Sequence, residues 1–368
     1  MRTALLCLLI LPSLSVGCAA PSESEGALAE APLSGLQEAP GEAAMKKIIA
    51  ESCPAGNQKI APTPIDIDTT SIPLWPKGKA DDLPTGTRFV GGWVLTSSHH
   101  GFGGLSGIDL LPDGNLLTVS DEGAFVWIDM KDDAPAGRGK LAYMRGPDGS
   151  YLRGKTDGDS EGLAVSDGIA YVSFERRHRI EAFALEACGA AAQSVLISTL
   201  PNDIDGVGIH ENAGAEALAF NAETLQAGFE QVINGRSGVI SLSDDMASVE
   251  MLEPVASGYG GPLVGMSNAL PTASDDGEKI TFALRRQFNP IFGNRLTIEA
   301  RYSNADEYTL AEGAVPVLKL SPPMSVDNFE GIAAKIQPDG SYRLWLISDN
   351  NFSPRQRTLL YAFDVSLP

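Results

Sequence analysis

The stretch Asp159-Ser160-Glu161-Gly162-Leu163-Ala164 recurs along the chain, and the spacing of its copies decides the fold. The other copies are Gly104-Leu105-Ser106-Gly107-Ile108-Asp109, Ala215-Glu216-Ala217-Leu218-Ala219 and Asn328-Phe329-Glu330-Gly331-Ile332-Ala333. Ser106, Glu161 and Glu216 are each 55 residues apart, and Glu330 follows after 114 residues, which is twice 57. This period predicts a missing copy near residue 270, where Ser267-Asn268-Ala269-Leu270 is a degraded match. Repeats of this length indicate a propeller or another repeat array.

Each repeat contains short alternating segments separated by turn residues, which is typical of antiparallel strands. The second repeat shows four of them, at 161–165, 169–175, 179–185 and 194–200, and four such strands make one propeller blade. The last repeat has no outer strand, whereas a spare strand, Arg88–Thr96, precedes the first repeat. We therefore expect an all-β, closed propeller of five four-stranded blades over residues 86–368, in which the spare strand completes the last blade. A six-bladed ring is the alternative.

The N-terminus resembles an export signal. Arg2 is followed by an apolar run at 4–11, and Leu14-Ser15-Val16-Gly17-Cys18 resembles a bacterial lipobox. We expect residues 1–17 to be a lipoprotein-type signal peptide, cleaved before a lipid-modified Cys18; ordinary cleavage after Ala20 is the alternative. Residues 18–85 are predicted to be a flexible tether, because their first half is rich in Ala, Glu, Pro and Ser. The protein is then an exported lipoprotein of the outer membrane or periplasm, or else a secreted protein.

Cysteine usage and charge restrict the environment further. Cys53 and Cys188 remain after the signal and lipidation cysteines are set aside, and they either form a disulfide or stay as thiols. The net charge of −20 excludes nucleic acid as a partner, because phosphate contacts need a basic surface. The same charge is compatible with bound divalent cations. We expect a monomer that contacts the membrane only through its lipid anchor.

The repeat also predicts where the chemistry lies. In a blade, the start of the first strand and the end of the second lie on the same face, so the repeated polar residues gather at one mouth of the channel. Crowded carboxylates bind calcium well, and the predicted metal ligands here are Glu161, Glu216, Glu330 and Asp349. Arginines at the strand ends are candidates for binding an anionic substrate; they are Arg176, Arg285 and Arg286. The candidates for activating water are His99, His100, His178, His210, Asp121 and Glu175.

Structural explanations exist for the same residues. Each repeated Glu could accept backbone hydrogen bonds where two blades meet, and Asp121 and Asp349 could be turn residues. Arg176 could belong to a solvated charge cluster. A non-catalytic, surface-tethered binding module is therefore the alternative to a hydrolase, since propellers host both roles.

The copies at Glu161 and Glu330, together with Leu346-Ile347-Ser348-Asp349-Asn350-Asn351-Phe352, resemble the phytase-like, esterase-like propeller domains of exported bacterial proteins. The resemblance covers about residues 88–366 and implies calcium-dependent hydrolysis of an ester or phosphoester. The layout is also similar to that of calcium-dependent lactonase propellers, which adds Asn350 to Glu330 and Asp349 as a channel calcium ligand. Lysines are almost absent from the predicted mouth, which argues against myo-inositol hexakisphosphate as the substrate.

Overall fold

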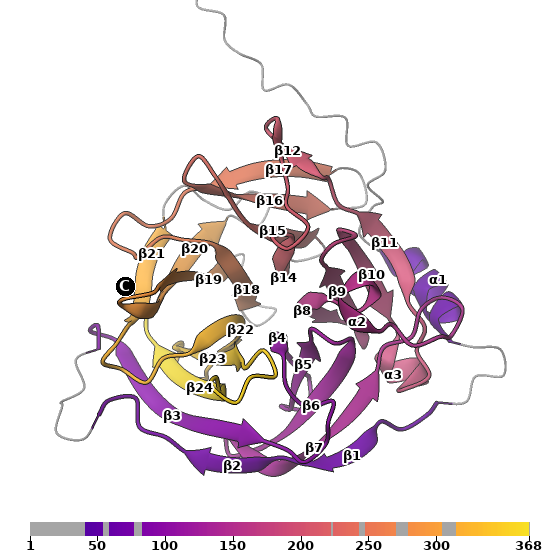
Figure 1. Cartoon of the computed structure of the whole chain (residues 1–368), viewed down its shortest axis with the longest axis horizontal. Helices are drawn as coiled ribbons and strands as arrows, with labels where there is room; N and C mark the ends of the chain where they lie inside the picture. The colour runs from indigo at the N-terminus through magenta and orange to yellow at the C-terminus, as the bar shows by residue number, and fades with distance from the viewer. Residues whose placement is uncertain are drawn as a thin grey trace, which may run out of the picture. The chain divides into compact units, whose positions relative to one another are not determined.

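The computed structural model describes residues 41–53, 59–76, 83–221, 224–242, 247–269, 279–303 and 314–367. Five antiparallel sheets surround a central axis (Figure 1), so the five-bladed propeller is confirmed and the six-bladed alternative is not. Three short helices, α1 (Glu42–Ser52), α2 (Gly154–Asp157) and α3 (Leu185–Cys188), lie outside the sheets. No helix in the described part of the chain has the length and apolar character needed to cross a membrane.

The strands of each blade follow one another outwards from the axis. Blade 1 consists of β4 (Leu105–Leu110), β5 (Leu116–Ser120), β6 (Ala124–Lys131) and β7 (Ala134–Tyr143). Blade 2 consists of β8 (Ser160–Ser166), β9 (Ile169–Phe174), β10 (Arg179–Phe183) and β11 (Val195–Thr199). Blade 3 consists of β14 (Ala215–Asn221), β15 (Thr224–Ile233), β16 (Arg236–Leu242) and β17 (Ala247–Leu252). Blade 4 consists of β18 (Leu263–Ala269), β19 (Lys279–Asn289), β20 (Gly293–Ser303) and β21 (Ala314–Leu320). Blade 5 begins with β22 (Asn328–Ile336), β23 (Tyr342–Asp349) and β24 (Thr358–Val365). A small hairpin, β12 (Asp203–Ile204) and β13 (Val207–Gly208), joins blades 2 and 3.

The ring closes through the N-terminal strand, as the sequence predicts. β3 (Thr87–Thr96) pairs antiparallel with β24 and is the fourth strand of blade 5. This pairing covers the free edge of β24, which would otherwise expose unpaired backbone groups. It also links the two ends of the domain, since Thr87 pairs with Val365.

The predicted tether differs from the structure where the structure describes it. Residues 18–40 lie outside the described residues, but β1 (Thr63–Asp66) pairs with β7 of blade 1 and β2 (Asp68–Ser71) pairs with β3 of blade 5. Upstream of them, α1 ends at a disulfide between Cys53 and Cys188, whose Cα atoms are 5.5 Å apart. Residues 42–53 and 59–75, which we call the strap, therefore contact blades 2, 1 and 5 in turn. The expected flexible segment stops short of 85 because edge-strand pairing gives this polar stretch backbone partners.

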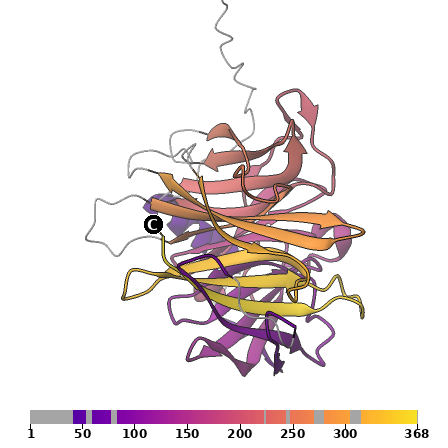
Figure 2. The ribbon, with the colours of Figure 1, turned by 90° about the vertical axis from the view of Figure 1, so that its left-hand side faces the viewer.

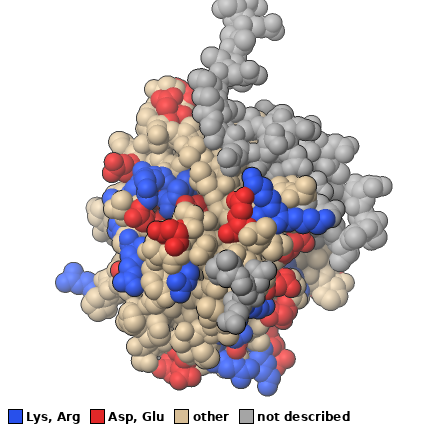
Figure 3. Space-filling model, turned by 90° about the vertical axis from the view of Figure 1, so that its right-hand side faces the viewer, with Lys and Arg blue, Asp and Glu red and all other residues tan. Residues whose placement is uncertain are grey.

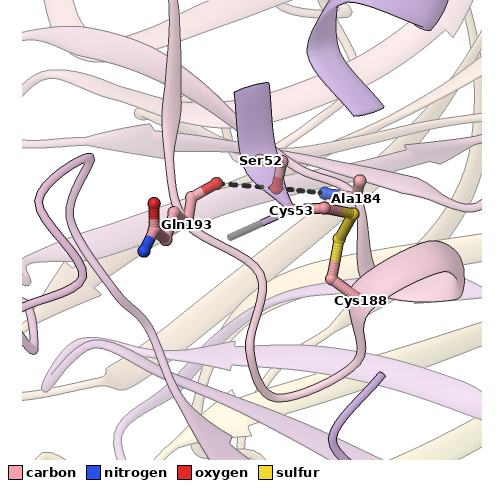
Figure 4. The surroundings of a disulfide bond; sticks show 5 residues. All are labelled: Ser52, Cys53, Ala184, Cys188 and Gln193. Atoms are coloured by element: carbon pink, nitrogen blue, oxygen red, sulfur yellow. Dashed lines mark hydrogen bonds between the residues drawn. A yellow bond between two sulfur atoms is a disulfide. The ribbon is translucent and has the colours of Figure 1, made fainter. Parts of the chain in front are cut away.

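Hydrogen bonds hold the strap beside the disulfide (Figure 4). Ser52 Oγ donates to the carbonyl oxygen of Gln193 at 2.7 Å and accepts from the backbone N–H of Ala184 at 3.0 Å. Ser52 is fully buried, so these bonds satisfy a hydroxyl that has no access to water.

On the side of the molecule shown in Figure 3, basic and acidic side chains are interspersed.

The repeated phrase is a β-bulge. In all five innermost strands the register with the second strand shifts at the same place, between Leu105 and Ile108 in blade 1 and at the corresponding residues of the others. A bulge places two residues opposite one and redirects a side chain. The bulge in β18 lies between Leu263 and Gly265, so the fourth copy is centred on Val264 and the expected match at 267–270 is wrong in register. The sequence hides this copy because a valine replaces the polar residue.

The glycine that follows the bulged residue has a packing role. A Cβ on Gly107 would lie 2.7 Å from the carbonyl oxygen of Glu161, and one on Gly162 would lie 2.8 Å from that of Glu216. Gly265 approaches the carbonyl oxygen of Glu330 in the same way, at 2.9 Å. In blades 1, 2 and 4 the inner strand therefore packs against the bulge of the next blade so closely that a residue without a side chain is needed.

Candidate metal and anion site at the channel mouth

Two sets of five equivalent positions surround the mouth of the channel. The bulge ring consists of the bulged residues of the innermost strands, Ser106, Glu161, Glu216, Val264 and Glu330. The strand-end ring consists of the residues where the second strands reach the mouth, Asp121, Glu175, Glu230, Arg286 and Asp349. Their equivalence follows from the backbone: Glu175 N–H donates to the Asp159 carbonyl at 3.0 Å, and Arg286 N–H donates to the Pro262 carbonyl at 3.0 Å. Blade 4 thus supplies a valine and an arginine where the other blades supply polar or acidic residues.

Glu175 is shared by two groups of carboxylates. Ligand oxygens of Asp159, Glu161 and Glu175 lie within 4.8 Å of one another, and so do those of Glu175, Glu216 and Glu230. Both groups consist only of oxygen donors, the type that hard divalent cations prefer. The structure therefore brings together Glu161 and Glu216, which the sequence predicts as metal ligands, but joins them through Glu175, which it predicts as a catalytic group.

Burial makes this concentration of negative charge unfavourable. Desolvation and the neighbouring carboxylates raise the pKa of Glu161 and of Glu216 well above the usual range of a glutamate. Desolvation also raises the pKa of Glu175 to about 7 and that of Asp349 to about 8, and in Asp349 the charge of Glu330 adds to the effect. A bound cation would relieve this repulsion.

Two carboxylate oxygens in the rings have no partner. Asp121 Oδ1 and Glu216 Oε2 are buried and accept no hydrogen bond from the described residues. A buried acceptor without a partner is costly, so the donor set fits an additional cation. A small pocket in the channel is lined by Glu216 and Glu330 of the bulge ring together with the apolar side chains of Ile108, Leu163, Leu218, Met266 and Ile332.

Three basic side chains already contact the carboxylates. Arg286 pairs with Glu330 and, at 3.3 Å, with Glu230. Burial by itself would lower the pKa of Arg286, but the negative charges of Glu330, Glu216 and Glu230 have the larger effect, so the pKa of Arg286 is raised above its usual value. This arginine is thus a resident counter-ion of the rings rather than a free substrate ligand.

Lys155 and Arg176 are more accessible than Arg286. Lys155 Nζ lies 2.7 Å from Asp121 Oδ2 and 2.8 Å from Asp159 Oδ1, and Arg176 Nε lies 3.0 Å from Asp159 Oδ2. The Lys155 side chain is 51% exposed, whereas those of Asp121 and Asp159 are 9% and 3% exposed. Arg176 also has a left-handed backbone with φ of 60°, an uncommon conformation for a side chain of its size. Both cations are placed to bind an anion that enters from the solvent.

The histidines lie around the carboxylates rather than among them. His178 is buried, desolvation lowers its pKa, and its Nδ1 packs against Gly214, whose N–H donates to Glu175 Oε1 at 2.9 Å. His99 and His100 stack with ring centroids 4.9 Å apart, and His100 Nε2 lies 2.9 Å from Tyr143 Oη. His210 is exposed, and its N–H donates to Gln231 Oε1. Of the four, His178 is nearest to the carboxylate groups by its contacts.

Two predicted site residues are engaged in packing. Arg285 is 1% exposed and pairs with Glu299 at 3.0 Å inside blade 4, because its side chain points away from the channel while that of Arg286 points toward it. This is the alternation expected along a strand. Asn350 Oδ1 accepts from the N–H groups of Gly104 and Phe352, so it connects blade 5 to blade 1. Neither residue enters the proposal below.

Some site residues are missed by sequence reasoning. Glu230 occupies the same strand-end position as Asp121 and Glu175, so the repeat could have identified it. Asp159 opens the repeated phrase of blade 2, where the equivalent residues of the other blades are not acidic, so the repeat does not single it out. Lys155 lies in the connection between β7 and β8 and has no repeat equivalent, so nothing in the sequence places it at the mouth. It is an exception to the expectation that lysines are almost absent from the mouth.

Comparison with known proteins gives a family match and distant structural similarities. The model of the phytase-like family described as "Esterase-like activity of phytase" matches residues 100–352. No curated protein matches the chain. Among solved structures, the PQQ-bound aldose sugar dehydrogenase of Streptomyces coelicolor is 16% identical with a TM-score of 0.40, covering 77% of this chain and 100% of that one. The glutaminyl cyclase of Myxococcus xanthus is 11% identical with a TM-score of 0.40, covering 76% and 97%.

Proposed function

Since this chain belongs to the phytase-like family described as "Esterase-like activity of phytase", we propose that it is a calcium-dependent hydrolase of phosphoesters that acts at the channel mouth. The observation that carries the proposal is the pair of carboxylate groups joined by Glu175. Asp159, Glu161 and Glu175 would hold one cation, and Glu216 and Glu230 would complete a second position with Glu175. When bound, calcium polarises the phosphoryl oxygen and acidifies water.

The basic residues favour a phosphoester over a neutral carboxylic ester. A cation bound by Asp159 competes with Lys155 and Arg176 for the same two oxygens. Both basic side chains are then free to bind the phosphoryl group, Arg176 in a bidentate manner. Asp349 lies outside both three-carboxylate groups, and above its pKa of about 8 its carboxylate would be the group that accepts a proton from water.

We also propose that the protein works outside the cytoplasm. The Cys53–Cys188 disulfide supports this location, because such bonds persist in oxidising compartments. The signal peptide and Cys18 lie outside the described residues, so lipid anchoring remains a prediction from the sequence.

The experiment pairs calcium titration with an assay on para-nitrophenyl phosphate and para-nitrophenyl acetate. We expect the wild type to bind calcium by calorimetry and to hydrolyse the phosphate only when calcium is present. Glu175→Gln should lose calcium binding and turnover together. Lys155→Met should keep or strengthen calcium binding but raise KM for the phosphate about tenfold, because one charge-assisted phosphate contact is lost. Lys335→Met, at an exposed position of β22, is the matched control and should leave both unchanged.

Two results would overturn the proposal. Hydrolysis that is unaffected by chelator and by Glu175→Gln would exclude the carboxylate groups as the catalytic metal site. Calcium binding without turnover of any ester would instead favour a tethered binding module.

A further inference from the structure

Exposed apolar side chains encircle the channel mouth. Among the described residues, seven of the eleven exposed large hydrophobic side chains lie at the mouth face, either at the ends of second strands or in connections, and all five blades or their connections contribute; they are Tyr151, Val207, Val232, Phe288, Ile291, Phe292 and Phe352. The other four, Ile49, Ile60, Leu196 and Val249, lie on α1, in the strap or on outermost strands at the perimeter. Apolar surface concentrated on one face of a soluble protein marks an interaction surface.

The most apolar part of this surface is the β19–β20 hairpin. The second strands of blades 3 and 4 both continue three residues beyond the strand-end ring, β15 to Ile233 and β19 to Asn289 (Figure 2, orange for β19). Phe288, Ile291 and Phe292 at its tip are 68%, 85% and 55% exposed, the three highest values among the large hydrophobic side chains described. The eight residues 287–294 carry no charge, although the whole chain has a net charge of −20.

Arginines accompany the apolar residues. Arg295 lies over the ring of Phe292 at 4.7 Å and over that of Tyr259 at 5.4 Å. Arg145 and Arg153 lie over the ring of Tyr151 at 4.3 and 5.1 Å. An aromatic ring with a guanidinium beside it suits the boundary between acyl chains and phosphate groups, since the ring enters the apolar layer and the cation stays at the headgroups.

We propose that the mouth face docks on a phospholipid surface, with the β19–β20 hairpin inserted among the acyl chains. This contact is additional to any lipid anchor. The strongly negative net charge opposes an anionic surface, so a zwitterionic phospholipid is the expected partner. Docking would bring the carboxylate rings against the headgroup layer. Together with the proposed function, on which this step rests, that position points to the phosphoester of an amphiphile as the substrate class.

The test measures binding of the full chain to phosphatidylcholine vesicles by sedimentation, with Cys18→Ser in every variant so that no lipid is attached at the predicted site. The Ile291→Ser, Phe292→Ser double variant should lower the vesicle partition coefficient by at least about tenfold, because two exposed apolar side chains leave the acyl layer. The Leu196→Ser, Val249→Ser double variant carries the same kind of change on outermost strands and should bind as the wild type does. Thermal melts verify that both variants fold.

The outcomes separate docking from catalysis. Absence of vesicle binding by the wild type, or equal loss in both double variants, overturns the docking proposal, even if a soluble phosphoester is hydrolysed. Hairpin-dependent binding without hydrolysis of any ester supports docking and removes the proposed function. Binding that rises with the content of anionic lipid would contradict the assignment to a zwitterionic surface.

Discussion

At the scale of single residues, the site brings together buried carboxylates that repel one another, so its assembly lowers the stability of the folded protein. Glu161, Glu175 and Glu216 come from different positions in two blades, and each has its pKa raised by burial. Arg286, Lys155 and Arg176 compensate part of the charge but leave buried carboxylate oxygens with no hydrogen-bond partner among the described residues. Such uncompensated groups are characteristic of sites that bind a ligand of opposite charge.

The raised pKa values predict how stability depends on pH. Glu175 and Asp349 titrate at about 7 and about 8 in the folded protein, above the values of unfolded carboxyl groups near 4. Between these limits the folded state binds more protons than the unfolded state, so the free energy of unfolding falls as the pH rises. Without calcium, the melting temperature should therefore decrease from about pH 5 to about pH 8 and then level off.

Thermal melts in chelator across this range measure the effect. Calcium should restore several degrees at the upper end, because the ionised carboxylates are its ligands, and Glu175→Gln should flatten the slope. A melting temperature that rises over the same range in chelator would contradict the electrostatic account.

At the scale of elements, one local motif builds both the ring and the site. The bulge directs a polar side chain into the channel, and the glycine after it lets the neighbouring blade approach. Stability and function therefore depend on adjacent residues of the same phrase. Blade 3 has Ala217 in place of the glycine, and blade 4 has Val264 in place of the polar residue, so the two requirements are separable.

Gly162→Ala should destabilise the protein by about 1–3 kcal/mol. The added Cβ would lie 2.6 Å from Ser173 Oγ and 2.8 Å from the carbonyl oxygen of Glu216, so the backbone of the next blade has to move. Gly208→Ala in β13 is the control, since its Cβ would meet only Asn202 O at 3.9 Å, and it should change the free energy of unfolding by less than about 0.5 kcal/mol. Denaturant titration decides the point, and equal effects of the two substitutions would refute the packing role.

At the scale of the whole molecule, the chain closes its ring twice. β3 completes blade 5, and the strap then continues past blade 1 to the disulfide in blade 2. The junction between the first and last blades, which the chain crosses once from β3 to β4, is thus also spanned by β1 and β2.

Loss of the disulfide should lower the free energy of unfolding by about 2–5 kcal/mol, because Cys53 and Cys188 are 135 residues apart and their bond restricts a long loop in the unfolded chain. The Cys53→Ser, Cys188→Ser double variant tests this by denaturant unfolding. Reductant should destabilise the wild type to a similar extent and leave the double variant unchanged. An insensitive wild type would show that the strap contributes little to global stability.

The sequence by itself determined the features that are periodic. The spacing of Ser106, Glu161, Glu216 and Glu330 predicts five blades and a common mouth, and the missing outer strand predicts the closure by 88–96. These predictions are correct because a repeat places equivalent residues at equivalent positions, whatever their neighbours are. Where a residue departs from the repeat, as Val264 does, the sequence no longer predicts which residue of the strand forms the bulge.

Only the tertiary structure decided which of the gathered residues meet. Alternation along β19 sends Arg286 into the rings and Arg285 into the blade, and a shift of one residue would exchange them. Lys155 reaches Asp121 and Asp159 across a connection that has no periodicity, and the strap pairs with blade edges that lie far away in sequence. Such contacts depend on distances between blades, which are set by packing of the complete ring and are not encoded in any single segment.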